Sequence, residues 1–186
     1  REQRTERLAP NGKRSNLDNV QYDNVRTPAF KKWFGDWEND PKNASKVVDE
    51  NGEPLVVYHG TAAKDVEVFK KGENFRSGGG IYFTNSIESA KTYDRDPTIY
   101  AAFLNVKNPR IENANNRKWD DVIGGKAIWD IVKESKSNNY NGVIIKNIVD
   151  SGGFSQFLLP PQDNYIAFKP NQIKLADGSN ATFDPD

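Results

Sequence analysis

The sequence predicts a single α+β domain with a largely antiparallel sheet. Segments whose pattern predicts short strands outnumber those whose pattern predicts helices, and the two kinds do not alternate regularly along the chain. The length of 186 residues suits one domain with its own core. Because only 35% of the residues are hydrophobic and the mean hydropathy is -0.82, that core should be compact and the loops long and polar.

The first 25 residues are expected to be a polar linker or an arm laid over the domain, which then occupies residues 26–186. They are rich in turn-forming residues. The apolar side chains among them are too sparse for a periodic face: Leu8, Leu17, Val20 and Tyr22. Since the chain starts without Met and its last residues close no recognisable element, we interpret it as a segment of a longer polypeptide.

An amphipathic helix is expected just after this segment. Thr27 can act as its N-cap, and Pro28 suits the first helical position. Four aromatic residues then recur at i, i+3, i+4 and i+7: Phe30, Trp33, Phe34 and Trp37. This spacing gives the helix one aromatic face.

A β-hairpin should follow this helix. Its turn is predicted at Asp49–Glu53, where the Asn-Gly pair supplies the positive-φ positions that a hairpin turn requires. Its second strand begins at Leu55 and runs into His59-Gly60.

The other elements are read from the same kinds of signal. Gly78–Gly80 leads into a strand at 81–84, and Asn85 or Ser86 then caps a helix that continues to Tyr93. The remaining predictions are strands at 99–106, 142–148, 165–168 and 173–175 and a helix at about 126–136.

The composition excludes several chemistries. The absence of cysteine removes thiolate nucleophiles, redox pairs and zinc ribbons, and a single histidine removes every site that needs two imidazoles. No metal is expected. The 26 basic and 26 acidic residues give a formal charge of +0, so the overall charge does not attract a polyanion. No apolar run reaches a membrane-spanning length, and we expect a soluble chain with no membrane partner.

His59, the single histidine, ends a predicted strand. Gly60 and Thr61 follow it, and their small size lets a ligand approach the backbone closely. A structural histidine, with its imidazole bonded to a carbonyl, is the alternative. The chain has no GxSxG elbow for a Ser-His-Asp triad, and Gly78–Gly80 fits neither GxGxxG nor the P-loop.

Three segments are much more specific when taken together. They are Tyr58–Thr61, then Gly80–Thr84 with Tyr93 eleven residues after Tyr82, then Asn164–Phe168. In order and spacing they resemble the ADP-ribosyltransferases of the diphtheria-toxin and poly(ADP-ribose) polymerase type. The resemblance covers about residues 27–178 and implies the split, mainly antiparallel sheet of that fold with flanking helices. Three further segments of the sequence are most similar to the branch of the family found in phage polyvalent proteins and toxins. These segments are Thr27–Asp36, Gly142–Asn147 and Phe168–Lys174.

The resemblance implies that NAD+ is the co-substrate and assigns residues to it. His59 would bond a ribose hydroxyl, the Gly60 backbone would take the nicotinamide carboxamide, and Tyr82 and Tyr93 would bracket the ring. The serine that the family often carries three residues before the second tyrosine is Ala90 here. Two residues are possible substitutes for it: Thr61 and Ser89. Four basic residues could meet the NAD+ diphosphate or a nucleic acid, or form a solvated face: Lys64, Lys70, Lys71 and Arg76.

Asn164 stands where the family's catalytic glutamate would stand, and it completes a catalytic set with His59 and Tyr82. Its amide can bond the ribose 2′-hydroxyl, but it cannot place a negative charge beside an oxocarbenium-like state. Strand alternation puts Gln162 and Asn164 on one face and Asp163 on the other. The alternative is that Asn164 is simply the residue that opens a strand.

The resemblance also implies an acceptor. The loop that precedes the last motif is where these enzymes select it, which points to three residues: Phe154, Phe157 and Gln162. The two phenylalanines could instead pin the loop to its own core. We therefore expect a mono-ADP-ribosyltransferase that modifies a protein or a nucleic acid, as a toxin or a phage or defence effector. It would act in the cytoplasm of the producing or target cell, with an antitoxin or immunity protein as a possible partner. The alternatives are a domain that binds NAD+ or ADP-ribose with little activity, and an NAD+ glycohydrolase.

Overall fold

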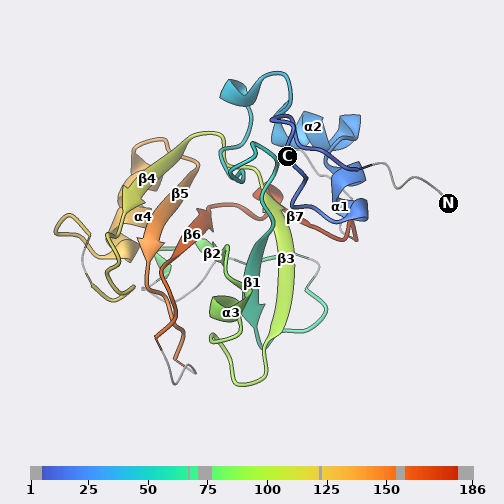
Figure 1. The fold of residues 1–186 in the computed structure, drawn as a ribbon. Coiled ribbons are helices and arrows are strands. Elements are labelled where there is room, and N and C mark those ends of the chain that lie inside the picture. The colour runs from blue at the N-terminus through green and yellow to red at the C-terminus, as the bar shows by residue number, and fades with distance from the viewer. Residues whose placement is uncertain (1–5, 67, 71–76, 122, 154–157, 180–186) are drawn as a thin grey trace.

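A mixed sheet organises the molecule (Figure 1). The computed structural model describes residues 6–66, 68–70, 77–121, 123–153 and 158–179. Seven strands form the sheet in the order β4-β5-β6-β2-β1-β3-β7, and every neighbouring pair is antiparallel except β4 with β5. The predicted α+β class with a mainly antiparallel sheet is therefore confirmed.

The elements have the following bounds. The strands are β1 Val57–Thr61, β2 Ile81–Thr84, β3 Thr98–Leu104, β4 Pro109–Asn113, β5 Gly142–Ile148, β6 Gln162–Ala167 and β7 Ile173–Leu175. The helices are α1 Asn19–Asn24, α2 Pro28–Phe34, α3 Ile87–Ala90 and α4 Ile128–Ser137, with short 3-10 turns at Pro41–Asn43 and Pro170–Gln172. None of the helices in the described part of the chain is long and apolar enough to cross a membrane.

The sheet is split between β1 and β2. These two strands are joined through one register pair, Tyr58 with Thr84. By contrast, β1 pairs with β3 through five residues, and β2 pairs with β6 through four. The sheet therefore consists of two halves, β4-β5-β6-β2 and β1-β3-β7, which separate from each other at the join.

Apolar side chains cover both faces of the sheet because they alternate along its strands. Phe83, Tyr165 and Ala167 belong to a core on one face. The core on the other face has two parts. The sheet contributes Val143, Ile145 and Ile166, and α4 contributes its buried residues Ile128, Ile131 and Val132. A third cluster lies under α2 and includes Phe30, Trp33, Phe34 and Phe103.

The helix α2 begins where the sequence predicts. The Thr27 side chain accepts a hydrogen bond from the Phe30 amide at 3.2 Å, and Pro28 is the first helical residue. The helix ends at Phe34 because Gly35 adopts a φ of 98°. Trp37 consequently lies beyond the helix, yet it remains buried and its indole donates to the carbonyl of Val25 at 2.9 Å.

Other predicted elements are also shorter than expected, and two elements were not predicted. The reversal of the hairpin is present as an isolated bridge between Val48 and Pro54, but its second strand begins at Val57 instead of Leu55. The helix expected to reach Tyr93 ends at Ala90, although Ser86 caps it as proposed. Neither β4 nor α1 was predicted, since their sequences have only weak periodicity.

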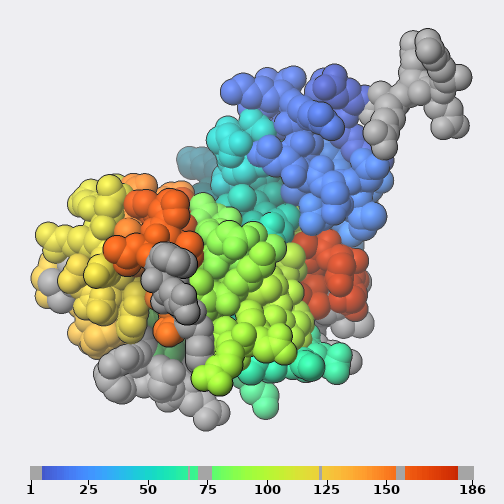
Figure 2. Space-filling view, turned by 60° about the horizontal axis from the view of Figure 1, so that its bottom comes forward, coloured from blue at the N-terminus to red at the C-terminus, as the bar shows by residue number. Residues whose placement is uncertain are grey.

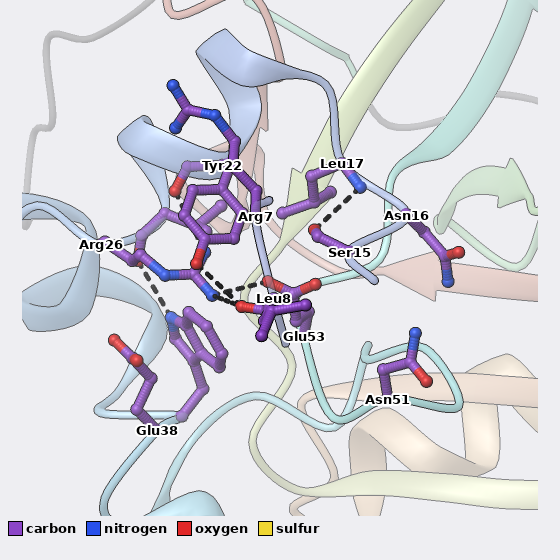
Figure 3. Close-up of polar contacts among 12 residues, drawn as sticks. Arg7, Leu8, Ser15, Asn16, Leu17, Tyr22, Arg26, Glu38, Asn51 and Glu53 are labelled. Atoms are coloured by element: carbon purple, nitrogen blue, oxygen red, sulfur yellow. Dashed lines mark hydrogen bonds and ion pairs between the residues drawn. The ribbon is translucent and has the colours of Figure 1, made fainter. Parts of the chain in front are cut away.

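Residues 6–25 lie against the domain through polar contacts (Figure 3). Asp18 and Gln21 form a capping box at the start of α1, and none of the residues of that helix is buried. The carbonyl of Leu8 accepts a hydrogen bond from the Tyr22 hydroxyl at 2.8 Å. Val25, the last residue of the expected arm, is fully buried in the cluster under α2.

An ion pair directly follows the N-terminal segment. Arg26 donates to the carboxylate of Glu53 at 2.7 Å, and its guanidinium lies over the rings of Tyr22 and Trp37, 3.4 and 4.9 Å from their centroids. Figure 2 shows the first part of the chain (blue) as a lobe at one end of the molecule, apart from residues near 110–120 (yellow).

Candidate functional site

A cavity of about 470 Å³ opens where the sheet splits. It is lined by β1 on one side of the split, by β2 and β6 on the other, and by α4 and the segment that follows β5. Five residues of the predicted site are in its lining: His59, Gly60, Tyr82, Tyr93 and Asn164. Residues 105 positions apart in the chain therefore meet in one place, as the three-motif hypothesis requires.

His59 bridges the two halves of the sheet. Its Nδ1 lies 2.7 Å from the carbonyl oxygen of Tyr82, and because a carbonyl only accepts, the proton is on Nδ1. The ring packs against Phe69 and Phe83, with centroids 5.5 and 5.4 Å away. Burial lowers the pKa of His59, and the carbonyl bond opposes this shift. The imidazole is therefore neutral at neutral pH and keeps Nε2 as an acceptor.

This arrangement matches both interpretations of His59 made from the sequence. The carbonyl bond is the one expected of a structural histidine, and the same residue lines the cavity. Fixing one nitrogen determines which nitrogen a ligand can meet.

Gly60 is required by packing as well as by the cavity. A Cβ at this position would lie 1.9 Å from the carbonyl oxygen of Ala90, at the end of α3. Any side chain would therefore push α3 away from β1. The absence of a side chain has a structural cause that the sequence alone does not reveal.

The two tyrosines hold fixed positions in the cavity. The hydroxyl of Tyr82 donates to the carbonyl of Ser77 at 2.9 Å, and the hydroxyl of Tyr93 donates to the carboxylate of Asp150. Burial raises the pKa of both phenols, and the charge of Asp150 adds to the effect. Tyr93 as a whole residue is 40% exposed, and it is part of the cavity lining.

Asp150 is the site residue that the sequence analysis missed. It is 4% exposed, lines the cavity, and accepts a hydrogen bond on Oδ2 from Asn164 Nδ2 at 2.7 Å. Burial raises the pKa of its carboxyl, while the hydrogen bonds from Tyr93 and Asn164 lower it. The sequence signal that could have identified Asp150 is its position, since it follows the strand β5 and immediately precedes a Ser-Gly-Gly segment.

Asn164 and Gln162 point to the same side of β6, as predicted. Asn164 is 3% exposed, and Gln162 donates to the hydroxyl of Ser89 at 2.8 Å. Asp163 lies on the opposite side and accepts from Lys146 at 2.8 Å. The alternation predicted for this strand is confirmed.

Other predicted residues lie elsewhere. Ser89 is fully buried outside the cavity lining, where its hydroxyl donates to the carbonyl of Asp150 at 2.6 Å. Gln162, expected in the acceptor loop, is instead a buried first residue of β6, because its amide binds Ser89 and the Asp150 carbonyl. Thr61 accepts from the Ala63 amide at 3.2 Å and is not in the cavity lining.

Some predictions fall outside the described residues: Arg76, Phe154, Phe157 and Lys71. Of the other two basic residues, Lys70 lines the cavity and Lys64 lies in a separate surface depression. Within the part of the chain that the structure describes, no group of three or more His, Asp or Glu side chains could hold a metal ion.

The family comparison agrees with this geometry. The family model described as ADP-ribosyltransferase in polyvalent proteins matches residues 49–183, a span that contains all seven strands and the whole cavity. The chain belongs to this family. The ADP-ribosyltransferase fold and the family suspected from three short motifs are both confirmed. ADP-ribosyltransferases use NAD+ as co-substrate. The comparison with curated proteins found no match to this sequence.

Proposed function

We propose that this domain is a mono-ADP-ribosyltransferase that cleaves NAD+ in the cavity at the split of the sheet and transfers ADP-ribose to a macromolecule. The observation that carries the proposal is the convergence of His59, Tyr82, Tyr93 and Asn164 on one cavity, in a chain of this family. Two tyrosine rings in the walls suit a flat leaving group.

The proposed reaction breaks the bond between C1′ of the ribose and the ring nitrogen of nicotinamide. The leaving ring takes the bonding electron pair, which neutralises its positive charge. A nucleophile of the acceptor then bonds to C1′ and releases its proton to solvent. Tyr82 and Tyr93 hold the leaving ring, and the free nitrogen of His59 accepts a hydrogen bond from a ribose hydroxyl.

The acceptor would meet the cavity beside the segment that follows β5. Gly152 and Gly153 line the cavity, so this segment lies next to the reacting centre. We propose a protein or nucleic-acid acceptor and a role as a toxin or as a phage or defence effector. Such an effector would act in the cytoplasm of the producing or target cell, where an antitoxin or immunity protein could bind it.

The test uses NAD+ labelled in its adenylate half, incubated with the protein and a cell lysate. Nicotinamide release together with a labelled macromolecule supports the proposal, and separate protease and nuclease digestion then assigns the acceptor class. Release without a labelled macromolecule would indicate an NAD+ glycohydrolase. Binding of NAD+ without release would indicate a binding domain. Asn164→Ala, which removes a polar group of the cavity, is the matched negative control.

A further inference from the structure

The family's catalytic glutamate is replaced by Asn164 in this chain. The cavity nevertheless contains a carboxylate, that of Asp150. We propose that Asp150 supplies the negative charge of this site and stabilises the positive charge that develops on the ribose during NAD+ cleavage. The proposal rests on the proposed function. Its basis is the place of Asp150, whose carboxylate lies in the cavity lining and bonds directly to Asn164.

Asp150 and Asn164 together provide what one glutamate would provide. Because the amide nitrogen of Asn164 donates to Asp150, its Oδ1 is the atom that remains for a ligand. That oxygen is buried and has no hydrogen-bond partner among the described residues. A ribose hydroxyl is a donor that would satisfy it. Asn164 thus accepts the hydroxyl, and Asp150 carries the charge.

The carboxylate is held in a fixed orientation. Its side chain accepts hydrogen bonds from Tyr93 and Asn164, and its backbone carbonyl accepts one from Ser89 at 2.6 Å. The chain just after Asp150 is also held in place, because the Gly152 amide donates a hydrogen bond to the Thr92 hydroxyl at 2.7 Å. Charge stabilisation is most effective when the charged group needs no rearrangement, and these contacts provide that rigidity.

The surroundings of Asp150 leave its charge available. Its partners in the described part of the chain are neutral donors, and no ion pair joins it to Lys70, the basic residue in the cavity lining. A buried anion without a cation is costly, and a cation in the cavity relieves that cost. Burial raises the pKa of Asp150, and the hydrogen bonds from Tyr93 and Asn164 oppose this shift in part.

The first experiment measures nicotinamide release by Asp150→Asn, with Asp163→Asn as the matched control. Both substitutions neutralise an aspartate that contacts β6 or belongs to it. Asp150 bonds to the Asn164 side chain of that strand, whereas Asp163 lies on the strand's opposite face and binds Lys146. We expect kcat to fall about 100-fold for Asp150→Asn and to stay near the parent value for Asp163→Asn. Asp150→Ser, which also lacks the charge, repeats the test in case the amide disturbs folding. Parent-like turnover by folded Asp150 variants would overturn the proposal.

The second experiment does not depend on turnover. Calorimetry compares ADP-ribose with ADP that carries a hydroxylated pyrrolidine, whose ring is cationic at neutral pH. The parent should bind the cationic compound about 30-fold more tightly, and Asp150→Asn should lose this preference. If the parent shows that preference but releases no nicotinamide, the proposed function fails while the role of Asp150 as the anion stands. An unchanged preference in Asp150→Asn would overturn that role.

Discussion

Glu53 and Asp150 are both buried carboxylates, and the difference between their partners separates two regions of the molecule. Glu53, fully buried at the base of the N-terminal lobe, is paired with Arg26. Asp150, in the cavity, accepts hydrogen bonds from Tyr93 and Asn164, which carry no charge. A buried anion with its own cation serves the fold. One with neutral partners remains able to act on a charged ligand.

The largest expected effect concerns the ion pair of the N-terminal lobe. Arg26→Ala should lower the free energy of unfolding by about 3 kcal/mol, because it leaves the charge of Glu53 buried without its partner. Urea denaturation measures this. Lys91→Ala, which breaks an exposed pair with Glu88, is the control and should have a small effect. Equal effects of the two substitutions would show that burial does not distinguish these pairs.

Tyr93 tests the cavity through its ring. Tyr93→Ala should weaken NAD+ binding by about 1–2 kcal/mol, roughly tenfold, through the loss of stacking. Tyr93→Phe keeps the ring and loses the hydrogen bond to Asp150, so its affinity should change less. Calorimetry on folded variants is the measurement, and unchanged affinity in Tyr93→Ala would contradict the proposed stacking of this ring on nicotinamide.

A truncated chain beginning at Val25 tests whether the two regions are independent. NAD+ affinity should be unchanged, since no residue before Tyr58 lines the cavity. Stability should fall by about 1 kcal/mol, because Arg26 loses the ring of Tyr22 beneath its guanidinium. Thermal melting and calorimetry of the same sample report both quantities. A truncated chain that does not fold would make the arm part of the domain.

The smallest effect is a pH dependence of stability at Asp150. Burial raises its pKa in the folded protein, so the folded state holds this proton more tightly than the unfolded chain does. Its ionisation therefore costs stability above the raised pKa and costs nothing below the ordinary carboxyl range. Asp150→Asn should melt higher than the parent at neutral pH, and the difference should shrink as the pH falls. A constant difference across that range would contradict the sign.

Much of the fold could be predicted from local signals. The capped start of α2 and the bounds of β5 and β7 follow from N-cap chemistry and apolar runs, which are properties of neighbouring residues. The hairpin turn was predicted from its Asn-Gly pair, but turn chemistry says nothing of where the strand after the turn begins, which is Val57 instead of Leu55. The strand β4 is half-exposed at the sheet edge, so its sequence lacks a buried run.

The candidate site divides in the same way. His59, Tyr82 and Asn164 stand in motifs whose spacing is visible in the sequence. Asp150 does not, because the side chains that it binds are 14 and 57 positions away and are brought to it by the sheet and by α3. An aspartate before Ser-Gly-Gly is typical of a turn on the surface. Only the burial of Asp150 in the structure distinguishes it from such a turn residue.

The most direct test neutralises the two carboxylates separately and measures nicotinamide release per folded molecule. Asp150→Asn should stay folded and lose about 100-fold in kcat. Glu53→Gln should be less stable, and its folded fraction should release nicotinamide at the parent rate, because Glu53 is outside the cavity lining. Parent-like turnover by Asp150→Asn, or a comparable loss of kcat in folded Glu53→Gln, would contradict the division between a structural and a functional carboxylate.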